Sequence, residues 1–193
     1  MERDYDYATA IYASDLPPAA ELGRSAGDKT VARLNPRKVE TTQVPVLFDP
    51  RVSGSMLGHL SGAINGSAIA RGTSFLKDRM GEQIFPTSIN IIDDPLRKRG
   101  LRSKAFDGEG LPTRERKIIE NGVLQSWTMD LRSARQLGLE STGSAARGNS
   151  SPPGAGQTNF YMVAGEMMPA ELMADIGTGL YVTEMIGHGG NPV

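Results

Sequence analysis

The sequence predicts an α+β protein with a mixed or antiparallel, β-rich domain and a packed helix that carries a stripe of glycines. Helical periodicity is concentrated in the first 70 residues, whereas short β-prone runs dominate the rest of the chain. An Asn-Gly pair at 121–122 between two β-prone runs predicts a hairpin. The 23 glycines and 12 prolines among the 193 residues indicate many turns and loops.

The N-terminal part of the chain predicts an arm followed by a helix. Residues 1–13 are typical of a strand or an extended arm. Asp15 is a candidate N-cap, and prolines follow it in the first turn. The run from Ala19 to Asn35 has small and apolar residues at helical spacing, and Pro36 ends it.

A second helix is predicted from Arg51 to Ala70, after a β-prone run over 44–48. Its glycines recur every four residues, at Gly54, Gly58, Gly62 and Gly66, and therefore lie along one side. Each glycine costs a helix about 0.5–1 kcal/mol relative to alanine. The stripe therefore indicates close packing against a sheet, which we favour, or a surface for a partner or an extended peptide.

The remainder of the chain predicts mostly strands. The expected elements are a strand (87–92), a long loop (93–112), hairpin strands (116–120 and 123–129), a short helix ended by Gly138 (133–137), a mobile surface loop (141–157), a strand (158–164), a helix (168–176) and a strand (180–186).

Composition excludes several classes of function. The net charge of −1 does not favour nucleic acid or an anionic membrane as a partner. Without cysteine there can be no disulfide, thiolate metal site or cysteine nucleophile in this chain. No apolar run approaches the roughly 20 residues of a membrane helix. We therefore expect a cytoplasmic protein.

Few residues point to catalysis. His59 and His188 lack the spacing of a zinc site, which needs three or four converging ligands. His188 lies in a glycine-rich turn after a strand and is the better candidate for ligand contact. The segment 53–55, Ser-Gly-Ser, lacks the strand-to-helix context of a nucleophile elbow and is more typical of a helix start.

Four carboxylates gather around one predicted loop: Asp93, Asp94, Asp107 and Glu109. They could hold a cation or act as acid and base. We favour solvated turn residues, because prolines and glycines neighbour them.

Many blocks, in order and in register from about residue 15 onward, resemble the PmbA/TldE family. They include Val44–Pro50, Gly58-His59-Leu60, Arg71–Leu76, Asp93-Asp94-Pro95, Arg99-Gly100-Leu101, Phe106–Gly110, Asn121–Gln125, Ser133-Ala134-Arg135, Ser141-Thr142-Gly143 and Gly179–Glu184. The resemblance implies that residues 1–38 are the end of an N-terminal α/β domain or a linker helix. It implies that residues 39–193 are most of a truncated, β-rich C-terminal domain.

The resemblance also implies a role. Members of this family pair with a homologous TldD subunit in a cytoplasmic peptidase, linked to maturation of microcin-like peptides and once described as a modulator of DNA gyrase. The matching TldD helix carries a His-Glu-x-x-x-His zinc motif, whose positions correspond to Leu57, Gly58 and Gly62 here. None of these three residues can bind zinc or activate water.

We therefore expect no catalytic residue, metal ligand or cofactor in this chain, with zinc only in a TldD-type partner. The expected substrate or partner surface comprises Gly54, Gly58, His59, Gly62, Gly66 and His188. Expected partners are a TldD-like subunit and a peptide, in a homo- or heterodimer. Two alternatives remain: a regulatory protein acting on DNA gyrase or its toxin/antitoxin partners, and an independent hydrolase that uses the four carboxylates.

Overall fold

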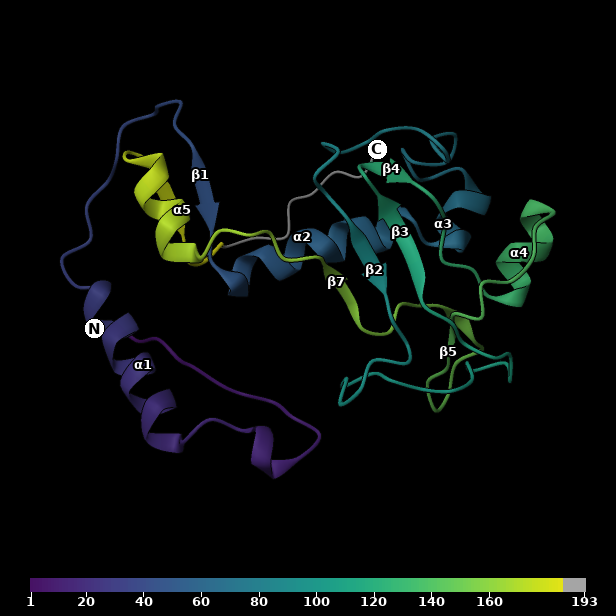
Figure 1. Ribbon diagram of the computed structural model, residues 1–193, viewed down its shortest axis with the longest axis horizontal. Helices are drawn as coiled ribbons and strands as arrows, with labels where there is room; N and C mark the ends of the chain where they lie inside the picture. The colour runs from purple at the N-terminus through teal and green to yellow at the C-terminus, as the bar shows by residue number, and fades with distance from the viewer. Residues whose placement is uncertain (186–193) are drawn as a thin grey trace. The chain divides into compact units, whose positions relative to one another are not determined.

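The computed structural model describes residues 1–185, and the chain forms two compact units, Met1–Gln43 and the part from Val44 onward (Figure 1). In the first unit, a 3-10 turn (η1, Ala13–Asp15) precedes helix α1 (Ala19–Ala32). Pro18, not Asp15, is the N-cap of α1, and residues 1–12 form neither a strand nor a helix. Lys29 pairs with Asp6 at 2.7 Å, which ties this arm to the helix.

The second unit is built on a four-stranded antiparallel sheet in the order β4-β3-β2-β7 (Figure 1). Its strands are β2 (Ile91–Asp93), β3 (Arg116–Glu120), β4 (Val123–Leu124) and β7 (Phe160–Met162). Two small sheets accompany it. Strand β1 (Val46–Phe48) pairs in parallel with β8 (Leu180–Val182), and β5 (Ala145–Ala146) pairs antiparallel with β6 (Gly154–Ala155). The predicted α+β class with an antiparallel sheet is confirmed.

The hairpin between β3 and β4 turns at Asn121 and Gly122, as predicted. Their φ angles of 49° and 80° are both left-handed, which is the geometry of a two-residue type I′ turn. Strand β4 is shorter than expected because the chain beyond it pairs elsewhere. Thr128 exchanges backbone hydrogen bonds with Ile64 and Gly66, at 2.9 and 2.8 Å.

The predicted helix over 51–70 is two helices, α2 (Pro50–Ala63) and α3 (Gly66–Arg71). The carboxylate of Asp49 accepts from the Arg51 backbone N–H and caps α2, so the segment 53–55 lies inside the helix rather than at its cap. Asn65 interrupts the run, because its side chain accepts from the Ser67 backbone N–H and caps α3. The break removes Gly66 from the helix that carries the other glycines.

The core lies among α2, α3 and the four-stranded sheet. Ile64, Ile118, Ile119 and Leu124 are fully buried within it. Helix α4 (Leu131–Leu137) begins at a capping box formed by Asp130 and ends at left-handed Gly138, as expected.

The prediction of a surface loop over 141–157 is wrong for residues 142–145, which are buried. Thr142 and Ser144 are buried, and Ala145 is inaccessible to solvent. The Thr142 hydroxyl accepts from the Met129 backbone N–H at 2.7 Å, so the segment belongs to the packed structure. Helix α5 (Pro169–Ile176) and β8 then lie where helix and strand were predicted.

Candidate functional site

Helix α2 presents a bare glycine face. Gly54, Gly58 and Gly62 are exposed, and a Cβ added to any of them would meet no atom within 4 Å. The close packing that we favoured for the stripe is therefore wrong at these positions. The helix buries its other side, through Val52 and Leu60.

Gly66 behaves differently from the other three glycines. A Cβ there would lie 2.6 Å from Ser133 Oγ and 2.9 Å from Met129 Cγ, so α3 packs closely at this point. Of the expected surface residues, Gly66 is therefore a buried packing position. His188 lies outside the described residues.

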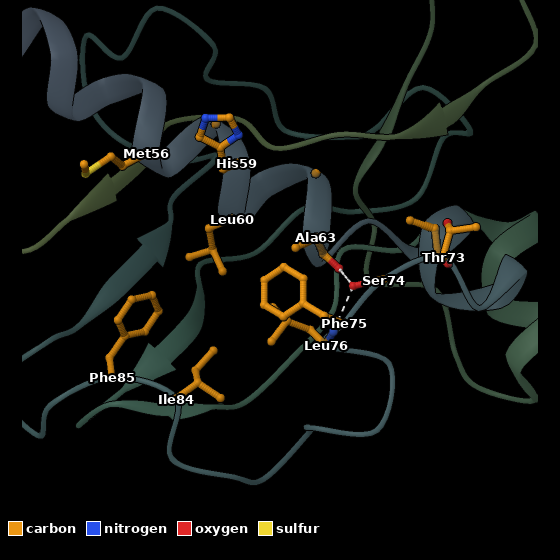
Figure 2. Close-up of a pocket in the computed structure, with 13 residues that line it drawn as sticks. Met56, His59, Leu60, Ala63, Thr73, Ser74, Phe75, Leu76, Ile84 and Phe85 are labelled. Carbon is orange, nitrogen blue, oxygen red and sulfur yellow. Dashed lines mark hydrogen bonds between the residues drawn. The ribbon is translucent and has the colours of Figure 1, made fainter. Parts of the chain in front are cut away.

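One side of α2 borders an apolar hollow of about 720 Å³ (Figure 2). Leu60, Phe75, Leu76, Ile84 and Phe85 point toward one another around it, whereas the imidazole of His59 stands apart from them. Phe75 keeps 62% of its surface exposed. The hollow can therefore accept apolar groups, and His59 lies at its rim.

A hydrogen-bonded loop shapes this apolar hollow. Ser74 Oγ donates to the Ala63 carbonyl at 2.6 Å and accepts from the Leu76 backbone N–H at 3.0 Å (Figure 2). The first bond fastens the loop after α3 to the last residue of α2, and the second lies within the loop. They thereby set Phe75 and Leu76 against the helix.

A second, more polar hollow of about 490 Å³ borders the other side of α2. Gly54, Leu57, Gly58 and Ser61 form one wall, and Leu101, Arg102 and residues 157–160 form the other. Gly58 lines both hollows. The Ser61 hydroxyl donates to Gln157 Oε1 at 2.5 Å, which joins the two walls.

The residues of α2 do not fit a zinc ion. Leu57 offers an aliphatic side chain packed against the core, and Gly58 and Gly62 offer none. His59 is one exposed imidazole, and a zinc site needs at least three converging protein ligands. Residues 1–185 contain no group of three or more His, Cys, Asp or Glu side chains that could hold a metal ion.

The four loop carboxylates do not form an acid–base site. Asp93 accepts from the Thr158 backbone N–H and hydroxyl, at 2.8 and 2.6 Å. Asp107 accepts from the backbone N–H groups of Glu109, Leu111 and Ala145, each at 2.9 Å.

These bonds show what the carboxylates do. Asp93 and Asp107 are each only 4% exposed, so the expectation of solvated turn residues is wrong for both. Asp94 accepts from the Leu96 backbone N–H, and Glu109 accepts from the Leu131 backbone N–H. Each of the four carboxylates thus holds a different segment of backbone in place.

A polar contact fixes the start of α2. The Tyr181 hydroxyl, on β8, donates to Asp49 at 2.6 Å. Burial acts to raise the pKa of Asp49, but the hydrogen bonds from Tyr181 and Arg51 outweigh it and hold that pKa below its usual range. The same bond to Asp49 raises the pKa of the Tyr181 hydroxyl.

Sequence reasoning missed several residues that shape the two hollows: Phe75, Leu101, Arg102, Gln157 and Asn159. One signal was available for Arg102, because basic residues are dense around it. The others face α2 only through contacts between distant parts of the chain.

None of the described helices is long and apolar enough to cross a membrane.

Comparisons with known proteins place the chain in a family. The model of the PmbA/TldA metallopeptidase C-terminal domain matches residues 41–193. Metalloprotease PmbA of Escherichia coli O157:H7 is 40% identical over 190 residues, which cover 98% of this chain and 40% of that protein. The chain thus spans about two fifths of the length of this relative.

Two solved structures share the fold. One, from Thermotoga maritima, is named as a candidate modulator of a DNA gyrase; it superposes with a TM-score of 0.87 at 30% identity, over 98% of this chain and 44% of that one. TldE from Thermococcus kodakarensis gives a TM-score of 0.80 at 27% identity, over 88% and 39%. With the family-model match, these likenesses show that the chain belongs to the PmbA/TldD family of metallopeptidases.

Proposed function

We propose that this chain belongs to the non-catalytic subunit of a TldD/TldE-type metallopeptidase complex. In this proposal the complex works in the cytoplasm, on peptides, in proteolysis and in maturation of microcin-like peptides. A TldD-like partner supplies the zinc ion that activates water, and the two subunits form a dimer. One observation supports this proposal most: the α2 residues Leu57, Gly58 and Gly62 have no side-chain group that could bind a zinc ion.

The geometry of α2 suits a subunit that guides a peptide rather than cleaving it. A helix face without side chains lets a second backbone come close, because no Cβ stands in the way. The apolar hollow beside Gly58 and Gly62 offers room for side chains of a bound peptide. These features would form part of the wall of a substrate chamber.

Reconstitution tests this function. The full-length protein and a TldD-like subunit from the same organism are purified separately and mixed, and cleavage of an unstructured peptide is followed by mass spectrometry. We expect cleavage only by the mixture and its loss on chelation of zinc. Zinc-dependent cleavage by this protein alone would overturn the proposal.

A second candidate is a regulatory protein that acts on DNA gyrase or its toxin/antitoxin partners. The Thermotoga maritima relative, named as a candidate modulator of a DNA gyrase, favours testing it. Pull-down of purified gyrase by this protein at moderate salt separates the two functions. Stable capture without any peptidase activity of the reconstituted mixture would favour regulation.

A further inference from the structure

The loop that follows β2 contains a strongly cationic segment. Residues 95–104, here called the cationic loop, include Arg97, Lys98, Arg99, Arg102 and Lys104 and no acidic residue. The whole chain, in contrast, has a net charge of −1. Such a local excess of one sign produces a positive potential that attracts anions.

The cationic loop has a defined shape because Asn159, just before β7, holds it. Asn159 Oδ1 accepts from the Arg102 backbone N–H at 3.1 Å, and Nδ2 donates to the Asp94 carbonyl at 2.7 Å and to Ser103 Oγ at 2.9 Å. A Cβ on Gly100 would lie 2.7 Å from the Asn159 side chain, so glycine permits this close approach. Because the backbone of the loop is already held in this way, binding orders chiefly the Lys and Arg side chains and costs less entropy than it would for a loose loop.

Four of the five cations have no anionic partner among the described residues, and two of these four make another contact. Arg97 lies over the Tyr161 ring, 4.6 Å from its centroid, and Lys104 Nζ donates to the Ala145 carbonyl at 2.8 Å. Lys98 and Arg102 are exposed, and no carboxylate lies within ion-pair distance of either in the part of the chain that the structure describes. Both remain available to an external anion.

The cationic loop forms part of the second hollow beside α2. Among the described residues that line this hollow, Arg102 is the only charged one, and there is no carboxylate to neutralise it. Leu57, Leu101 and Phe160 add apolar surface. The volume of about 490 Å³ lies within the usual range for ligand pockets, about 300–1,000 Å³.

We propose that the second hollow and the cationic loop bind an acidic segment of an extended peptide, with Lys98 and Arg102 selecting for Asp and Glu side chains. This inference rests on the proposed function, in which peptides reach α2. A single-stranded nucleic acid fits less well, because its binding sites combine a basic track with several stacked aromatic rings. Phe160 is the only aromatic residue among the described ones that line the hollow.

Fluorescence anisotropy with the full-length protein, alone and in its complex, tests this selection. Two labelled peptides of equal length are compared, one containing Asp and Glu and the other Asn and Gln at the same positions. We expect the acidic peptide to bind roughly threefold to tenfold more tightly at low salt, as two exposed ion pairs allow. At about 1 M salt, where the screening length is about 3 Å, the difference should vanish.

Charge variants identify the residues responsible. K98Q/R102Q should abolish the preference for the acidic peptide over its Asn and Gln counterpart. K98E/R102E should make a basic peptide bind more tightly than the acidic one. R132Q, which removes an exposed arginine of α4 remote in sequence from the loop, is the matched control and should keep the preference. Equal binding of the two peptides, or a preference that survives K98Q/R102Q, overturns the inference.

Two further outcomes are informative. Tighter binding of a single-stranded oligonucleotide than of the acidic peptide, lost in K98Q/R102Q, would overturn the inference in favour of nucleic acid. Failure of this inference is also distinguishable from failure of the proposed function. Peptide cleavage by the reconstituted complex without charge preference refutes only the inference, whereas charge-selective binding without any cleavage refutes only the proposed function.

Discussion

Replacing Gly58 by alanine should stabilise the protein. Gly58 lies inside α2, its φ is not left-handed, and an added Cβ meets no atom within 4 Å. The substitution therefore gains helix propensity without a clash, which is about 0.5–1 kcal/mol in the free energy of unfolding. Gly62→Ala should behave in the same way, because its surroundings are equally open.

Urea unfolding at 25 °C measures this gain as a higher transition midpoint with an unchanged slope. Gly66→Ala is the matched control, since its Cβ would lie 2.6 Å from Ser133 Oγ. We expect Gly66→Ala to destabilise the protein by about 1–3 kcal/mol, the usual cost of overpacking. A neutral or destabilising Gly58→Ala would contradict the open face of α2.

The same substitution tests why glycine is present. If Gly58 leaves room for a peptide backbone, its side chain should obstruct binding even where it stabilises the helix. Gly58→Leu, which fills more of the space, should lower the peptidase activity of the reconstituted complex further than Gly58→Ala does. Full activity in a stabilised Gly58→Leu variant would refute the role of this face.

Three other outcomes follow from a buried carboxylate, a left-handed turn residue and the contact between Tyr181 and Asp49. Asp107→Asn keeps only one acceptor oxygen for three backbone N–H donors. It should therefore lower the free energy of unfolding, measured in urea, by about 1.5–3 kcal/mol. An unchanged free energy would contradict the role of Asp107 in holding these backbone groups. Gly122→Ala should cost at least about 2 kcal/mol in the same assay, because φ is 80° and a Cβ would lie 2.1 Å from a carbonyl oxygen; unchanged stability would contradict the turn geometry. The pKa of the Tyr181 hydroxyl is raised, so this group should ionise above the ordinary value of about 10. Its hydrogen bond to Asp49 therefore stabilises the fold below pH 10, and this stabilisation is lost as the pH rises through the raised pKa. Ultraviolet titration should place this ionisation at lower pH in Asp49→Asn, and no change between the two proteins would count against the contact.

Local signals in the sequence predicted the elements that local interactions determine. Asn121 and Gly122 specify their turn through their own backbone preferences, and Gly138 ends α4 for the same reason. Motif blocks in register also predicted the family, which the comparisons confirm.

Contacts between distant segments decided what sequence reasoning missed. The helix break at Asn65 combines a local cap on Ser67 with a distant contact, because Thr128 bonds to the chain on both sides of the break. The burial of Ala145 depends on Asp107, whose carboxylate accepts its N–H across 38 residues of chain. Likewise, spacing alone could not show whether the glycines of α2 face a sheet or open space, because both arrangements give the same period.

The zinc content of the purified protein tests whether α2 lacks a metal site. The full-length protein is dialysed against zinc, separated from free metal and measured by inductively coupled plasma mass spectrometry, with the proposed TldD-like partner treated in parallel. We expect stoichiometric zinc in the TldD-like protein and none in this protein. One zinc ion per chain of this protein, lost on substitution of His59, would contradict it.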